Sequence, residues 1–77
     1  MEELLAELQE RFGNTEGLRL FNTILPGIMG DFNKMLKKAG VDVSVSEEYR
    51  LEDGSGVIRL NGCRLSDGSI KVEGHLI

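Results

Sequence analysis

The spacing of apolar residues changes at Gly40, and this change divides the chain into two halves. Before Gly40 they recur every third or fourth position, which is the period of an amphipathic helix. After it they recur at every second position, as in a strand with one buried face. The pattern predicts one α+β domain over residues 1–77, with a helical half over 1–40 and an antiparallel sheet over 41–77.

Two helices are expected in the first half. The first spans Glu2 to Phe12, where the leucines share one stripe and Gly13 offers a left-handed stop. The second spans Thr15 to Lys38, because a wide apolar arc keeps its phase through Pro26-Gly27. Proline removes one helical hydrogen bond, so we expect a kink at Pro26-Gly27 or a break into two nearly collinear helices.

Three strands are expected in the second half, at Val41–Glu52, Val57–Ser66 and Ile70–Ile77. The turn sequences Asp53–Gly56 and Asp67-Gly68 separate them. With these turns, apolar side chains face one another in four cross-strand pairs. The pairs are Leu51 with Ile58, Tyr49 with Leu60, Leu65 with Ile70, and Cys63 with Val72.

The apolar phase of the middle strand flips at Asn61-Gly62, since Ile58 and Leu60 hold even positions but Cys63 and Leu65 hold odd ones. Either a bulge inserts one extra residue there or Asn61-Gly62 is a tight hairpin. The hairpin sets two arginines directly opposite each other, which is unfavourable, so we expect the bulge. The two helices then pack on one face of a three-stranded meander, in the order α-α-β-β-β.

Composition excludes several classes of protein. One cysteine cannot form an intramolecular disulfide, and one histidine with it cannot build a structural zinc site. The longest apolar run is three residues, too short for a membrane span, and the first ten residues are too acidic for a signal peptide. We therefore expect a cytoplasmic protein without metal or other cofactor. The net charge of −4 disfavours unspecific phosphate binding.

One short motif suggests a nucleic-acid binder. Gly27-Ile28-Met29-Gly30, followed by a helix, Gly40 and a strand, resembles the core of a KH domain. The resemblance implies a turn between two helices that clamps the backbone of single-stranded nucleic acid, with Lys34, Lys37 and Lys38 close by. In the family the two middle residues are usually polar or basic, and an apolar residue usually stands at Asn33. A proline–glycine kink that lets helix and sheet approach closely explains the same residues.

No catalytic residue is predicted. By alternation Cys63 points inward and His75 outward, so they cannot form a nucleophile–base pair, and Cys63 is expected to be a buried structural residue. Acidic neighbours such as Glu47-Glu48 point to opposite faces and do not converge. Glu47 occupies an inward position, and either the bulge turns it outward or it lies at the rim of the sheet.

The patterns favour a small non-enzymatic protein-binding module: an adaptor, regulator or inhibitor. Small acidic domains of this kind include phage and mobile-element inhibitors of host systems; the alternative is a KH-like nucleic-acid binder using the Gly27–Gly30 turn. The surplus apolar helical surface predicts a homodimer. The protein-binding surface is expected on the outer sheet face, at Arg50, Arg59, Arg64, Lys71 and His75. Self-association is expected on the helices, at Leu5, Leu8, Phe12, Leu20 and Ile24.

Overall fold

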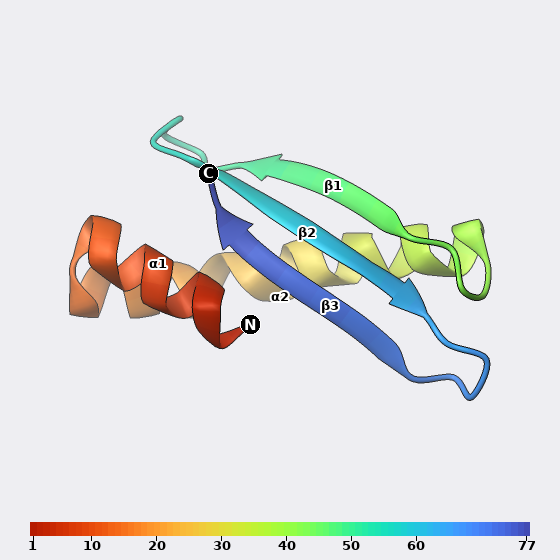
Figure 1. Cartoon of the computed structure of the whole chain (residues 1–77). Helices are drawn as coiled ribbons and strands as arrows, with labels where there is room; N and C mark the ends of the chain where they lie inside the picture. The colour runs from red at the N-terminus through yellow and green to blue at the C-terminus, as the bar shows by residue number, and fades with distance from the viewer.

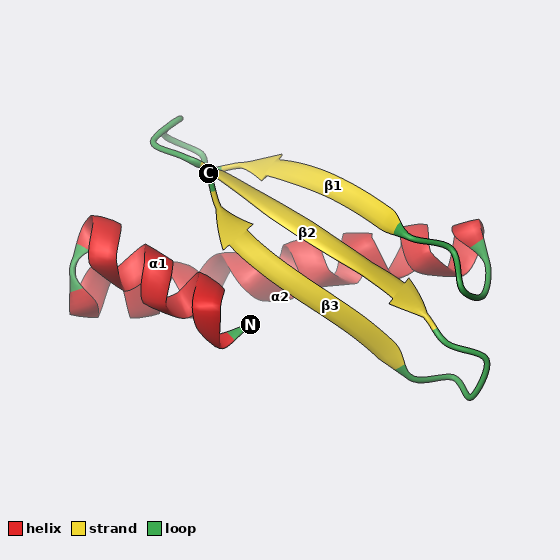
Figure 2. Cartoon of the chain, viewed as in Figure 1, coloured by secondary structure: helices red, strands yellow, loops and turns green.

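The chain folds into two helices followed by a three-stranded antiparallel sheet, in a computed structural model that describes all residues from 1 to 77 (Figures 1 and 2). The helices are α1 (Glu2–Phe12) and α2 (Asn14–Ala39), and the strands are β1 (Val45–Arg50), β2 (Val57–Arg64) and β3 (Ile70–Leu76). The sheet order is β1-β2-β3. The predicted α+β fold and its order, α-α-β-β-β, are confirmed.

The helices form where the apolar period predicts them. Gly13 separates α1 from α2 with a φ of 94°. At Gly17 a Cβ would lie 2.7 Å from the carbonyl carbon of Leu8, so glycine allows the two helices to approach closely. α2 continues through Pro26 and is one residue longer at each end than expected. The kink at Pro26 stays a prediction.

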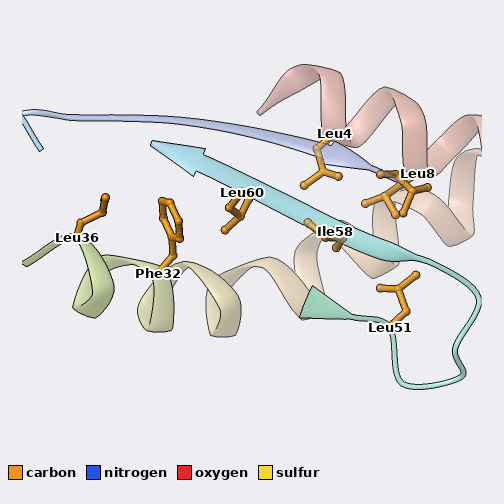
Figure 3. Close-up of a cluster of buried hydrophobic side chains, with 8 residues drawn as sticks. Leu4, Leu8, Phe32, Leu36, Leu51, Ile58 and Leu60 are labelled. Carbon is orange, nitrogen blue, oxygen red and sulfur yellow. The ribbon is translucent and has the colours of Figure 1, made fainter. Parts of the chain in front are cut away.

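The core lies between the helices and the inner face of the sheet (Figure 3). α2 packs against β1 and β2, whereas α1 packs against α2 and β3. Both helices therefore cover one face of the sheet, and no element of the chain covers the other (Figure 1). The buried side chains are Leu4, Leu8, Phe32, Leu36, Leu51, Ile58, Leu60 and Leu76.

β1 is shorter than the alternation of valines suggests. The expected strand starts at Val41, but the observed one starts at Val45. Asp42 has a φ of 59°, and its N–H donates to the carbonyl of Arg64 at 2.7 Å, so the chain turns sharply here. Val41 therefore makes only an isolated bridge, and its side chain is 45% exposed.

The loop between β1 and β2 shifts the first pairing by two residues. The N–H of Leu51 donates to the carbonyl of Gly56 at 3.0 Å, and Tyr49 pairs with Ile58 instead of Leu60. A shift of two residues keeps every side chain on its expected face. The apolar phase is thus preserved although the expected partners are wrong.

The turn between β2 and β3 has a larger effect. Gly68 has a φ of 90°, and the N–H of Leu65 donates to the carbonyl of Ser69 at 2.8 Å, so Ser66–Gly68 is a three-residue loop. The expected two-residue turn at Asp67-Gly68 is wrong. This shifts the pairing by one residue: Cys63 opposes Lys71 instead of Val72. A shift by one residue exchanges the faces of the side chains.

β2 is continuous from Val57 to Arg64, and neither a bulge nor a hairpin forms at Asn61-Gly62. The register directs Gly62 inward, and the space there has no room for a side chain. A Cβ there would lie 3.2 Å from Cε2 of Phe32 and would collide with the carbonyl oxygen of Lys71. The expected bulge and the expected inward Cys63 are both wrong.

Candidate functional site

The outer face of the sheet is covered by no other element of the chain (Figure 1). Arg59 on β2 lies directly opposite Glu48 on β1 and His75 on β3. These three residues therefore share the outer face, and every second residue along each strand shares it with them. Arg50, Arg59 and Lys71, expected here from the sequence, lie on it and are exposed. The face also carries Ser46, Glu48, Asn61, Cys63 and Glu73.

Arg64 does not belong to the outer face, and its assignment there is wrong. It pairs with Ile70 at the inner register of β2 and β3, because the three-residue loop shifts the pairing by one. Its Nε is buried and has no hydrogen-bond partner. The side chain is half-buried at the end of the sheet instead of projecting into solvent.

His75 shares the register of the outer face but contacts α1. Its Nδ1 lies 3.2 Å from Oε1 of Glu7, and its Nε2 lies 3.6 Å from Oε2 of Glu3. The same Glu7 oxygen accepts the N–H of Leu76 at 3.4 Å. Because β3 is an edge strand, this ring can reach past the edge to the helix. His75 therefore ties α1 to the sheet and is a poorer candidate for partner contact.

Two cations of the outer face have no partner within the chain. Arg59 pairs with Glu48, with Nη2 at 2.7 Å and Nε at 3.1 Å from Oε2. Both side chains of this pair are about half exposed, so it contributes only about 0–1 kcal/mol of stability. Arg50 and Lys71 form no ion pair. Their charges are available to acidic groups of another molecule.

A shallow hollow of about 410 Å³ lies at one end of the sheet. Small residues create it: Gly62 and Cys63 follow one another on β2, with Ser46 on the neighbouring strand. Lys71 lies directly across from Cys63 on β3. The remaining lining residues are Ser44, Val45, Asn61 and Glu73.

Cys63 and His75 lie on the same register face, so the expected separation onto opposite faces is wrong. They still cannot act as a pair. Cys63 opposes Lys71, and His75 lies four residues further along β3, about 13 Å away at the rise of a strand. A nucleophile and its base need to lie within about 3 Å. No group of three or more His, Cys, Asp or Glu side chains is placed to hold a metal ion.

A polar cluster lies at the β1 edge, on the inner side of the sheet. Glu47 opposes Leu60 and is half-buried at the rim, one of the two placements that the sequence allows. The hydroxyl of Tyr49 donates to Oδ2 of Asp31 on α2 at 2.9 Å. Burial raises the pKa of Tyr49 strongly, and the hydrogen bond to Asp31 and the negative charges of Asp31 and Glu47 add to this effect.

The five helical residues expected to mediate self-association differ in burial and do not form one exposed surface. Leu8 is only 1% exposed because it belongs to the core, so its assignment to a contact surface is wrong. Phe12 and Ile24 are partly buried against the core, and Leu5 and Leu20 are half-buried. Leu20 and Ile24, however, line a second hollow of about 200 Å³ next to the end of β1; its other lining residues are Arg19, Thr23, Leu51, Glu52 and Asp53.

The KH-like turn at Gly27–Gly30 is not formed. Both glycines lie inside the continuous helix α2, with nothing near the position of an added Cβ. A helix interior presents no loop to clamp a phosphate backbone, because its backbone N–H groups are already hydrogen-bonded. The expected turn at Gly27–Gly30, which the alternative function requires, is therefore absent.

The chain was compared with protein families, curated proteins and solved structures. No family model, no curated protein and no solved structure matches this chain. Neither α1 nor α2 has the length and apolar character that a membrane-crossing helix needs.

Proposed function

We propose that the chain is a small, cytoplasmic, non-enzymatic protein-binding module that acts through the outer face of its sheet. The observation that carries this proposal is the bare outer face, which holds Arg50 and Lys71 without ion-pair partners. Arginine is enriched where proteins contact one another. The outer face carries both signs of charge with cations in excess, and such a pattern can fix the orientation of a partner with complementary charges.

The form of the outer face favours a protein over a small molecule. The hollow at Gly62 and Cys63 is wide and shallow, whereas pockets for small molecules bury most of the ligand. Its lining is mostly small and polar and includes one cation, Lys71, and one anion, Glu73. Such a surface fits the polar rim and side chains of another protein. The separation of Cys63 from His75 supports a role without catalysis.

An adaptor, a regulator and an inhibitor would all use this surface. The size and acidic charge of the chain support the inhibitor role, including inhibition of a host system by a phage or mobile element. The continuous helix at Gly27–Gly30 leaves the nucleic-acid alternative without its binding loop.

A charge reversal on the outer face tests the proposal. Lys71→Glu changes the exposed face, and Lys37→Glu makes the same change of charge on the exposed C-terminal turn of α2. We expect a purified partner, first captured on the immobilised wild type, to bind Lys37→Glu with unchanged affinity and Lys71→Glu at least about tenfold more weakly. Equal binding to all three proteins would contradict the proposal.

A further inference from the structure

The two edges of the sheet differ in how they are covered. α1 covers the C-terminal half of β3: a Cβ at Gly74 would lie 3.0 Å from the sulfur of Met1 and 3.1 Å from Cδ2 of Leu4. The N–H of Leu76, which points away from β2, donates to Glu7. No element lies beside the outer edge of β1 (Figure 1). The edge of β1 is therefore uncovered along its whole length and has unpaired backbone groups, whereas the edge of β3 is covered over its C-terminal half.

The hydrogen-bond pattern identifies these unpaired groups. Leu51 donates to Gly56, so the pairs formed by Val45, Glu47 and Tyr49 direct their backbone groups toward β2. Alternation then directs the N–H and C=O groups of Ser46, Glu48 and Arg50 away from the sheet. Another strand can pair with β1 only through these three residues.

A second copy of β1 can pair antiparallel about a two-fold axis, but like charges exclude most registers. An axis at Glu47, Glu48 or Arg50 sets that residue directly opposite its own copy, which is unfavourable. An axis at Ser46 places Glu48 opposite Ser44, before the start of the partner strand.

An axis at Tyr49 is different. It sets Glu48 of each copy opposite Arg50 of the other, and each such pair exchanges both backbone hydrogen bonds. It also sets the two Tyr49 rings opposite each other in the closer, non-hydrogen-bonded type of pair.

We propose that two copies of this chain associate through β1 with the two-fold axis at Tyr49, forming one continuous six-stranded sheet. Glu48 then lies between Arg59 of its own chain and Arg50 of the second copy, so the negative charge has two cationic neighbours. The half-buried Tyr49 becomes covered. The dimer thus forms through the sheet edge and not through the helical residues that the sequence suggests. In this dimer Arg50 is paired with Glu48 of the second copy, so Lys71 is the outer-face cation that stays free for the proposed binding function. The dimer itself does not require that function.

Two complementary variants test the charge pairing. Arg50→Glu leaves acidic residues at both 48 and 50, and Glu48→Arg leaves basic residues at both, so each alone opposes like charges across the axis. We expect the wild type to scatter light as a dimer of about 17 kDa, twice the chain mass of 8.5 kDa. Each variant alone should dissociate at least about tenfold more readily, and an equimolar mixture should regain the dimer. A monomeric wild type, or a mixture that stays monomeric while circular dichroism shows folded chains, would overturn the proposal.

Cysteine cross-linking tests the position of the axis. In a Cys63→Ser background, Tyr49→Cys places two thiols across the axis, within the Cα separation of about 4.4–6.8 Å that a disulfide needs. Glu47→Cys, on the same face, places them about 13 Å apart. We expect mild oxidation to link the first variant and not the second. Linkage of Glu47→Cys alone, or of both variants equally, would contradict this register. If Tyr49→Cys fails to fold, the mixture of Arg50→Glu with Glu48→Arg decides the question.

Discussion

The hydroxyl of Tyr49 on β1 donates a hydrogen bond of 2.9 Å to Asp31 on α2. This contact ties one edge strand to the helix beneath it. On the opposite edge, the contact of His75 with Glu7 ties β3 to α1. Each edge of the sheet is thus joined to the helical layer by one long polar side chain. The contact of Tyr49 joins β1 to α2 through the inner side of the sheet, and the outer edge of β1 stays open.

The raised pKa of Tyr49 gives a direct test of this contact. The chain has one tyrosine and no tryptophan, so the near-ultraviolet absorbance of tyrosinate reports this residue alone. We expect its titration midpoint well above the ordinary value, chiefly because of burial. Asp31→Asn removes a negative charge and should lower the midpoint without restoring the ordinary value. A midpoint near the ordinary value in the wild type would contradict the position of Tyr49.

The same shift predicts a loss of stability in alkali. An unfolded tyrosine releases its proton near pH 10, whereas folded Tyr49 retains it to higher pH. The folded chain therefore binds more protons above about pH 10, and the free energy of unfolding falls as the pH rises through this range. Below pH 10 this contribution is fully present. Urea unfolding followed by circular dichroism should show a smaller alkaline loss in Tyr49→Phe, and an equal loss in both would contradict the prediction.

The register of β2 predicts that substitution lowers stability at Gly62 but hardly changes it at the adjacent Cys63. Gly62→Ala adds a methyl group between Phe32 and the carbonyl of Lys71, and overpacking of this kind costs about 1–3 kcal/mol. Cys63→Ala changes an outward side chain and should alter stability by less than about 0.5 kcal/mol. Urea unfolding of both variants measures the difference. A larger loss at Cys63 than at Gly62 would favour the bulged register instead.

The glycines of α2 provide a test of the continuous helix. Gly27 and Gly30 lie in a helix interior with open space at the Cβ position. Alanine there should stabilise the chain by about 0.5–1 kcal/mol at each site, because glycine loses more backbone freedom in a helix. Thermal unfolding of the two single variants checks this. Destabilisation by both would indicate a turn that requires glycine, as in the KH-like interpretation.

Much of the fold is predictable because it depends on local period. The stripe of leucines predicts both ends of α1, and the change of period at Gly40 predicts the boundary between helices and sheet. The second hairpin is not predictable in this way, since Asp-Gly suits both a two-residue and a three-residue loop. The need for glycine at position 62 comes from the carbonyl of Lys71 and the ring of Phe32. Both lie on other elements, so the pattern of β2 itself does not reveal it.

The candidate site shows the same division. Alternation correctly places Arg50, Arg59 and Lys71 on the outer face. Arg64 is misplaced because it follows Asn61-Gly62, where the expected bulge is absent, so its side chain takes the opposite face. The contact of Tyr49 with Asp31 is missed because an aromatic residue on an apolar phase is expected in the core. The one available signal is Glu47, a charged residue on the inward phase, which is typical of an exposed edge strand.

The assignment of the outer face depends most directly on the side to which Cys63 points. Alkylation of the folded chain, followed by mass spectrometry, measures whether this thiol is accessible. We expect complete modification at a rate independent of added urea below the unfolding transition, with unchanged circular dichroism, because the thiol lies beside Lys71 on the uncovered face. Modification that proceeds only as the chain unfolds would place Cys63 in the core and would contradict the register on which the outer face is defined.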